Sequence, residues 1–259
     1  MKNCPIMVRM KENYESRSKT FLTRRTPVIL RIDGKAFHTY TRGLNKPFDE
    51  GLIEDMQEVT KYLCANIQGA KAGYTQSDEI SILLTDYDKL TTDAWFNYNV
   101  QKMTSISASL TTAKFNQLRQ SRLIYGKEES QITWKTEVEN FNLACFDSRA
   151  FNIPSSEVAN YFIARQKDAV KNSIAMLAQS LYSHKELHKK NGSDMQDMCF
   201  EKGHNWNDLP FEQKRGSLII KKPYVAGQQD NQPIMRYRWD VVETPISFGE
   251  VDFRKFTEI

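Results

Sequence analysis

The chain has 259 residues, of which 40% are apolar and 26% charged, and its formal net charge is +4. This composition is typical of a globular protein and excludes a disordered, collagen-like or coiled-coil chain. No apolar run approaches the roughly 18 residues of a membrane-spanning helix, and the N-terminal residues lack the pattern of a secretory signal.

Charge and cysteines give two further expectations. Residues 1–27 carry seven Lys or Arg against two Glu, a sum of +5, so the remaining residues sum to −1. Such a basic arm is one way to attract phosphate, and a solvated surface helix is the alternative. The four cysteines are spaced neither as a zinc site nor as a disulfide framework, which favours a reducing, cytoplasmic setting.

The first predicted elements are a strand, a helix and two strands. Residues 27–34 form a β-branched apolar run that ends at a glycine, which is typical of a buried strand. Residues 49–67 place apolar side chains three and four apart, which predicts a helix with Asp49 as its N-cap. Two short strands are expected at 70–76 and 79–85.

A second long helix is predicted from apolar residues at helical spacing, with Thr92 or Asp93 as its first residue. Residues 140–146 are predicted as a strand, and a third helix is expected to run to about Tyr182. The polar segment 183–215 is expected to be irregular. Strands are expected to return near 216–222 and 236–242.

The order strand, helix, strand, strand, helix, strand predicts an α+β protein with a ferredoxin-like (split βαβ) sheet and both helices on one face. We expect residues 1–182 to form the main domain with its basic arm. We expect residues 183–259 to form an appendage of helices and strands that packs on this domain and does not fold independently.

Carboxylates follow two strands that would be neighbours in this sheet. Asp33 ends the first strand, and Asp78 and Glu79 lie near the bend between the next two. Each motif alone also fits an ordinary polar turn. Together they would bring acids within a few ångströms, which costs free energy unless a cation compensates. Oxygens of this kind suit Mg²⁺, and two such ions can clamp the attacking and leaving oxygens of phosphoryl transfer.

The turn after Asp33 is a candidate phosphate site. Residues 34–38 (GKAFH) leave a strand through a glycine, and successive amides of such a turn can bind a triphosphate. The segment is not a Walker A loop, since GxxxxGK[ST] is absent. Phe37 is interpreted as core packing, and His38 either reaches a phosphate or caps the turn.

These residues resemble the tRNA-His guanylyltransferase superfamily, and most closely its Thg1-like branch. The resemblance covers roughly residues 8–222 and rests on ordered motifs: RIDGKAFH at 31–38, KPFD at 46–49, QSDE at 76–79, FDSR at 146–149, RQKDAVKN at 165–172, NWNDLP at 205–210 and KRG at 214–216. It implies a polymerase-type palm that extends RNA in the 3′-to-5′ direction.

The resemblance also implies roles for individual residues. The catalytic set is Asp33, Asp78 and Glu79. Two Mg²⁺ ions would be held by Asp33, Asp78 and the carbonyl of Gly34. The nucleotide-binding set is Asp33, Gly34, Lys35, Ala36, Phe37, His38, Lys46, Ser77, Asp78, Lys102, Arg149 and Asn172. Arg24, Arg25, Lys214 and Arg215 would contact RNA. GTP and ATP are the expected substrates, tRNA is the expected partner, and a homotetramer is the expected assembly.

One departure from the family pattern concerns the choice of nucleotide. Guanylyltransferases that add an untemplated G to tRNA-His carry HINN in the third helix, whereas this chain has VKNS at 170–173. The chain therefore resembles the branch that repairs truncated tRNA 5′ ends by template pairing. The alternatives are a true tRNA-His guanylyltransferase, a nucleotidyl cyclase with the same carboxylates, and a non-catalytic RNA chaperone, which would not need Asp33 and Asp78.

Overall fold

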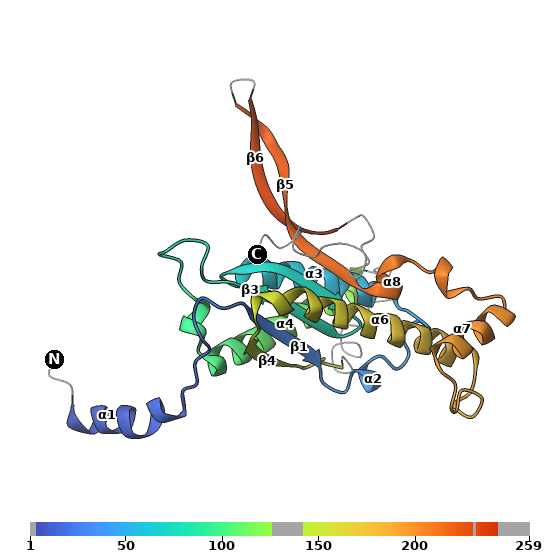
Figure 1. Ribbon diagram of the computed structural model, residues 1–259, viewed down its shortest axis with the longest axis horizontal. Helices are drawn as coiled ribbons and strands as arrows, with labels where there is room; N and C mark the ends of the chain where they lie inside the picture. Colours follow the sequence, from blue (N-terminus) through green and yellow to red (C-terminus); the bar gives the residue numbers. More distant parts are fainter. Residues whose placement is uncertain (1–3, 126–141, 230–231, 243–259) are drawn as a thin grey trace.

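A computed structural model describes residues 4–125, 142–229 and 232–242, and Figure 1 shows their arrangement. The strands are β1 (Val28–Gly34), β2 (Ala70–Gln76), β3 (Glu79–Leu84), β4 (Phe146–Asn152), β5 (Ser217–Gln229) and β6 (Gln232–Val241). The longer helices are α3 (Glu50–Asn66), α4 (Val100–Tyr125), α6 (Val158–Leu181) and α7 (Gly192–Glu201). The shorter helical segments are α1 (Pro5–Met10), η1 (Lys11–Glu15), η2 (Ser16–Ser18), α2 (Phe37–Tyr40), η3 (Trp95–Tyr98), η5 (Ser155–Glu157), η6 (Trp206–Asp208) and α8 (Phe211–Arg215).

The strands form one antiparallel sheet in the order β4-β1-β3-β2-β5-β6. The first four strands have the order of a split βαβ sheet, with α3 between β1 and β2 and α4 between β3 and β4. The predicted α+β, ferredoxin-like fold is therefore confirmed. Because β5 pairs with β2, the C-terminal strands extend the same sheet. The boundary expected at residue 182 stays a prediction.

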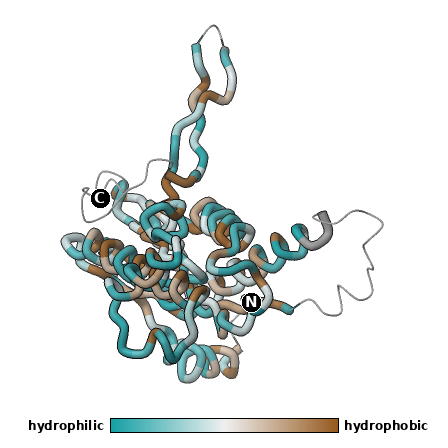
Figure 2. The backbone as a smooth tube through the Cα atoms, turned by 90° about the vertical axis from the view of Figure 1, so that its right-hand side faces the viewer, coloured by the Kyte–Doolittle hydropathy of each residue, from teal (hydrophilic) through white to brown (hydrophobic). Residues whose placement is uncertain are grey.

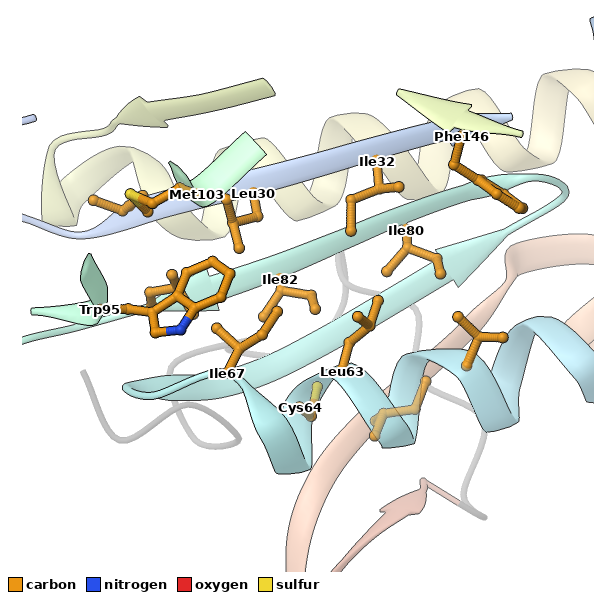
Figure 3. Packing of buried hydrophobic residues seen from close by; sticks show 14 of the residues in the cluster. Leu30, Ile32, Leu63, Cys64, Ile67, Ile80, Ile82, Trp95, Met103 and Phe146 are labelled. Atoms are coloured by element: carbon orange, nitrogen blue, oxygen red, sulfur yellow. The ribbon is translucent and has the colours of Figure 1, made fainter. Parts of the chain in front are cut away.

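Alternation along β1 sends its side chains into two cores. Leu30 and Ile32 pack with residues of α3 and α4, among them Leu63 and Met103 (Figure 3). Ile29 points to the other face, where it joins a cluster that includes Phe162 of α6. The sheet therefore lies between α3 and α4 on one face and α6 on the other, as expected for the first two helices.

Asp49 caps α3 as predicted, since the Leu52 N–H donates to Asp49 Oδ1 at 2.8 Å. The predicted start of the second long helix at Thr92 or Asp93 is wrong, because α4 begins at Val100. Residues 96–98 have φ values of 50°, 51° and 56°, and this left-handed backbone cannot continue into a right-handed helix. The side chain of Asn99 instead accepts a hydrogen bond from the Lys102 N–H.

The predicted strand 140–146 is displaced along the chain. β4 spans Phe146–Asn152, and residues 140 and 141 lie outside the described part. Phe146 pairs with Gly34, the last residue of β1, so no β1 residue remains to pair with the residues before Phe146. The main chain of Ala144 is held by the side chain of Asn116, which both donates to and accepts from it.

The segment expected to be irregular, 183–215, contains α7, η6 and α8. A capping box between Asn191 and Asp194 starts α7. Cys199 of α7 and Trp206 of η6 pack with the second half of α6 in a separate core cluster. At the other end of the chain, α1, η1 and η2 bury no residue and project from the body (Figure 1). This is the geometry of the solvated surface helix.

Candidate active site

Asp33, Gly34 and Asp78 meet at one end of the sheet. Asp33 is the last residue but one of β1, and Asp78 lies in the turn between β2 and β3, the next strand to β1. A Cβ on Gly34 would lie only 2.8 Å from Asp78 Oδ2. A carboxylate oxygen of Asp78 therefore lies against the main chain of Gly34, the residue after Asp33. The predicted convergence of the Asp33 and Asp78 carboxylates on a metal stays a prediction.

Both turns that carry the acids have a left-handed residue other than glycine. The φ values are 53° at Ala36 and 50° at Ser77. Such conformations cost about 1 kcal/mol or more and are retained where the surrounding structure fixes them. The Lys35 N–H donates to the Cys145 carbonyl at 2.8 Å, which fixes the first turn against the residue before β4.

Burial raises the pKa of Asp78 above its usual value, and the negative charges of Asp33 and Glu79 add to this effect. The raised pKa means that removing the proton from Asp78 costs free energy in the absence of a cation. A divalent cation between Asp33 and Asp78 would lower that cost. The donors at this point are carboxylate and main-chain oxygens, the ligand types that Mg²⁺ prefers.

Glu79 is positioned differently from the two aspartates. It is 5% exposed, and its Oε2 lies 2.7 Å from Arg31 Nη2 and 3.2 Å from Arg165 Nη1. Burial raises its pKa, while the two guanidinium groups lower it. Glu79 thus links β1 to α6 beside the acids, and it would have to leave two ion pairs to bind a metal. Its catalytic role stays a prediction.

Sequence reasoning did not identify this ion-pair network. Arg31 lies two residues before Asp33, so both side chains are on the face of β1 that packs on α6. Because side chains two apart on a strand share a face, the position of Arg31 relative to Asp33 was the sequence signal that could have identified Arg31 as a site residue. Arg165 was noted only as part of a motif. Its ion pair with Glu79 was not predicted, because no local pattern in the sequence indicates that α6 packs against the start of β3.

The 34–38 turn divides into a buried and an exposed part. Phe37 is 6% exposed, and its ring centroid lies 5.6 Å from that of Phe115 and 5.2 Å from that of Phe146. Its interpretation as core packing is confirmed, so its side chain does not face a nucleotide. Lys35 and His38 are exposed. The first amides of α2 have no acceptor within the helix, and Ala36 supplies no side-chain cap.

A pocket opens beside the turn that carries Ser77 and Asp78. Its polar lining includes Ser77, Gln76 and Asn172, and Phe48 and Met176 are among its apolar residues. α3, α6, α8 and the β2–β3 turn all contribute to it. The structure thus brings together Ser77 and Asn172, two residues that the sequence assigned to nucleotide binding. Phe48, Gln76 and Met176 were not identified.

Arg149 and Lys46 are two of the cations predicted to neutralise phosphate charge. In the β1–β4 pairing, Arg149 lies opposite Arg31 and Asp147 lies opposite Asp33. Arg149 is therefore on the same face of the sheet as Asp33. Its Nη2 is 3.5 Å from Asp147 Oδ1. Lys46 is exposed and lies two residues before Phe48 of the pocket.

Lys102 is not brought to this site. It lies in the first turn of α4, with its Nζ 5.8 Å from the ring centroid of Phe96. Ten residues further along α4, the hydroxyl of Thr112 accepts a hydrogen bond from the Phe146 N–H. Phe146 pairs with Gly34, so Thr112 lies at the end of the sheet that carries the acids. Ten helical residues span about 15 Å, so Lys102 lies near the opposite end of the sheet.

Among the four predicted RNA-binding residues, the side chains of Arg24 and Lys214 make contacts within the chain. The Nε of Arg24 lies 2.6 Å from Asp86 Oδ2, and Asp86 is fully buried. Lys214 Nζ donates to the Asn207 carbonyl at 2.6 Å. Arg25 is exposed, and its N–H donates to Asp86. The carbonyl of Arg215 accepts a hydrogen bond from the Tyr74 hydroxyl. Arg24 and Lys214 would have to break intrachain contacts to bind RNA.

In ranges 4–125, 142–229 and 232–242, no group of three or more His, Cys, Asp or Glu side chains could hold a metal ion. A site at Asp33 and Asp78 would therefore use two carboxylates together with main-chain or substrate oxygens. Within the same ranges, no helix has the length and hydropathy needed to cross a membrane.

Comparison with known proteins identifies relatives along nearly the whole chain. Two structures of a bacterial tRNA(His) guanylyltransferase (Thg1)-like protein, one in complex with ATP and one with GTP, are each 48% identical to this chain. The ATP complex has a TM-score of 0.83 and the alignment covers 98% of this chain and 97% of that one. The GTP complex has a TM-score of 0.77, with 98% and 99% covered.

More distant relatives come from a virus and an animal. An uncharacterized protein of Acanthamoeba polyphaga mimivirus is 28% identical, over 96% of this chain and 87% of its own. A probable tRNA(His) guanylyltransferase of Drosophila melanogaster is 24% identical, over 84% of this chain and 74% of its own. The family model of Thg1, tRNAHis guanylyltransferase, matches residues 7–154. The chain therefore belongs to the Thg1 tRNAHis guanylyltransferase family of nucleotidyltransferases.

Proposed function

We propose that this protein adds nucleotides in the 3′-to-5′ direction to the 5′ ends of truncated tRNAs, with the added nucleotide chosen by pairing with the opposite strand. The observation that carries the proposal is the meeting of Asp33, Gly34 and Asp78 at the end of β1. The ATP and GTP complexes of the 48% identical protein support nucleotide substrates.

The reaction has two steps. A 5′-monophosphate is first activated by ATP, which leaves an adenylylated end and releases pyrophosphate; a 5′-triphosphate needs no activation. The 3′-OH of the incoming nucleoside triphosphate then attacks the activated phosphorus. A new phosphodiester bond forms, and AMP or pyrophosphate leaves. The hydroxyl proton passes to solvent.

Asp33, Asp78 and the Gly34 carbonyl would hold two Mg²⁺ ions. Bound there, Mg²⁺ supplies positive charge against the developing charge on the attacking and leaving oxygens. Arg149, on the Asp33 face of β4, would neutralise charge on the phosphates, and Lys46 would do so from the edge of the pocket. Arg31 and Arg165 hold Glu79 and so fix the start of β3 next to Asp78.

The triphosphate would lie against the first amides of α2, and the base or sugar would enter the pocket beside Ser77. Two features support this. The first amides of α2 lack intrahelical acceptors, and an anion at that position is stabilised by them. Asn172 lines the pocket with Ser77, which puts an amide donor and acceptor near the reacting end.

The residues at 170–173 support templated choice. Ser173 is 3% exposed; its Oγ accepts from Trp206 Nε1 at 3.0 Å and lies 2.9 Å from the Val170 carbonyl oxygen. It therefore joins α6 to η6 where the untemplated enzymes carry the last Asn of HINN. With this position buried and the histidine replaced by Val170, the protein lacks that pattern for reading the nucleotide. Untemplated G addition to tRNA-His is the alternative; the Drosophila relative is named a probable tRNA(His) guanylyltransferase.

We also propose cytoplasmic localisation and a homotetramer. Cys4, Cys64, Cys145 and Cys199 are free cysteines, as expected in a reducing compartment. Light scattering from the full-length protein would test the assembly, since a tetramer has four times the mass of the chain.

The test of the activity is a primer-free extension assay. The substrate is a 5′-triphosphorylated tRNA that lacks its first nucleotide, offered with Mg²⁺ and each nucleoside triphosphate in turn. We expect addition of only the nucleotide that pairs with the unpaired partner on the 3′ side, and the added nucleotide should change when that partner is changed. Addition of G to tRNA-His whatever the partner would support the alternative.

Two controls complete the assay. Asp33→Asn and Asp78→Asn should each lose nearly all addition, because stabilisation of charge at phosphorus is the main protein contribution. Pyrophosphate release without RNA would instead indicate a cyclase. Unchanged addition by both variants would contradict the proposed site.

A further inference from the structure

β5 and β6 form a hairpin that projects from the sheet, as two perpendicular views show (Figures 1 and 2). Only residues 217–219 of β5 pair with β2, and from residue 220 onward β5 pairs with β6 alone. Val225 is 59% exposed and Tyr237 is 62% exposed. A two-stranded ribbon is marginally stable alone in water. A partner that covers a face of the hairpin would therefore add stability.

Register divides the hairpin into two chemically different faces. Tyr224 pairs with Arg236 and Lys222 pairs with Arg238, so these four side chains share one face. We call them the basic face. The other face carries the pairs Val225 with Met235 and Pro223 with Tyr237, and Lys221 lies on it opposite Trp239. Cations are thus concentrated on one side and apolar groups on the other.

The charge of the hairpin suits an anionic partner. Residues 221–229 and 232–238, the part that the structure describes, include four cations and no carboxylate. Arg238 lies 3.0 Å from Asp240 at the base of the hairpin and 5.6 Å over the ring of Tyr224. Arg236 is exposed and has no carboxylate partner among the described residues. As far as the described residues are concerned, Arg236 is therefore available to an external anion.

The basic face is also within reach of the candidate active site. Ser217 pairs with Thr75, three residues before Asp78. Seven residues of strand separate Ser217 from Tyr224, which corresponds to about 23 Å. An RNA stem whose 5′ end lay at Asp33 and Asp78 would carry sugar-phosphate backbone over this distance.

We propose that the basic face of the hairpin binds the sugar-phosphate backbone of the tRNA stem. The inference rests on the proposed function and locates an RNA contact that the sequence had assigned elsewhere, to Arg24, Arg25, Lys214 and Arg215. RNA is favoured over a second hairpin on this face, because self-pairing would bring six cations together, and among the described residues only Asp240 at the base of each hairpin lies beside one of them. Phosphates compensate these charges directly.

The test compares two exposed cations on opposite faces of the same hairpin, Arg236→Ala and the matched control Lys221→Ala. Affinity for a truncated tRNA transcript is measured by fluorescence anisotropy between about 0.05 and 0.2 M salt. Each phosphate contact contributes about −0.9 to the slope of log K against log salt. One contact therefore strengthens binding about eight-fold at 0.1 M salt relative to its contribution at 1 M salt, and a variant that lacks the contact should lose this gain. Arg236→Ala should lower the slope by about one unit, and Lys221→Ala should leave it unchanged.

The kinetic readout separates binding from chemistry. Arg236→Ala should raise KM for tRNA without changing kcat, since the residue lies far from the reacting atoms. If wild-type protein neither binds tRNA nor adds nucleotides, the proposed function fails. If wild-type protein does both, yet Arg236→Ala and Lys221→Ala have equal slopes, only the hairpin inference is overturned. A lower assembly mass for Arg236→Ala at unchanged tRNA affinity would also overturn it, and would identify an interface between copies.

Discussion

Gly34→Ala is the sharpest perturbation of the candidate active site, because it adds one methyl group without changing charge. The new Cβ would overlap Cδ2 of Phe37 and would lie 2.6 Å from its Cε2 and 2.8 Å from Asp78 Oδ2. Ordinary contact begins at about 3.4 Å. Because each of these contacts is too short, both the ring and the carboxylate must move, or the backbone at Gly34 must shift away from them.

The ring has little room to move. Phe37 is buried, and its ring centroid lies 4.9 Å from that of Tyr40, 5.6 Å from Phe115 and 5.2 Å from Phe146. Overpacking of this kind costs about 1–3 kcal/mol of stability. Asp78 is partly buried on the β2–β3 turn, and its carboxylate needs to move by about 0.6 Å to restore contact distance. A displacement approaching 1 Å at a reacting centre lowers turnover by about 100-fold.

The assay measures kcat for nucleotide addition together with the free energy of unfolding by denaturant. Gly192→Ala is the matched control: Gly192 is the first residue of α7, and an added Cβ there would have no neighbour within 4 Å. We expect Gly34→Ala to lose about 100-fold in kcat and 1–3 kcal/mol in stability. Gly192→Ala should keep full turnover and unchanged or slightly higher stability, since alanine favours a helix.

Two results would refute this reasoning. Wild-type turnover in Gly34→Ala would mean that Asp78 does not need its position against Gly34. A loss of stability with full turnover would mean that the aromatic cluster absorbs the methyl group, so that the placement of Asp78 is set elsewhere. Addition of nucleotides by Gly34→Ala at raised Mg²⁺ would still agree with the reasoning, because it would report a weakened metal site.

Three other outcomes are expected from the same geometry. Arg149→Ala should lower turnover about 100-fold, and Lys102→Ala should lower it much less, because Lys102 lies near the opposite end of the sheet; equal kcat losses would contradict this. Asp55→Ala should cost about 3 kcal/mol in denaturant unfolding, since Asp55 is 1% exposed and pairs with Arg119 and Arg122. Chelation should abolish addition reversibly with unchanged circular dichroism, because apolar packing fixes β1 and β3.

The sheet was predictable because local patterns determine it. The β-branched apolar run in residues 27–34 and the helical spacing in 49–67 each predict an element that must be buried, and both elements lie within a residue or two of their predicted bounds. The start of α4 was not predictable in this way. It depends on left-handed residues at 96–98, which no apolar spacing reveals. β4 likewise depends on which residue of β1 is its last partner.

The site was predictable where chemistry and topology coincide. Acids after neighbouring strands must converge in a split βαβ sheet, and Gly34 permits the approach that Asp78 makes. Residues that act from other elements were assigned less well. Lys102 was placed by motif alone, and a motif does not say at which end of a helix a residue meets the sheet. Arg24 looked like a free cation because its partner, Asp86, lies 62 residues away in the sequence.

The contrast between Asp78 and Glu79 shows how one sequence signal divides into two physical roles. The two acids are adjacent, and burial raises the pKa of each. Glu79 is compensated by two arginines of the protein, Arg31 and Arg165, so its charge is already satisfied. Among the described side chains, Asp78 has only Ser77 as a hydrogen-bond partner, and it faces the charge of Asp33. Its compensation must come from outside the described side chains, and a cation held with Asp33 beside a nucleotide triphosphate would provide it.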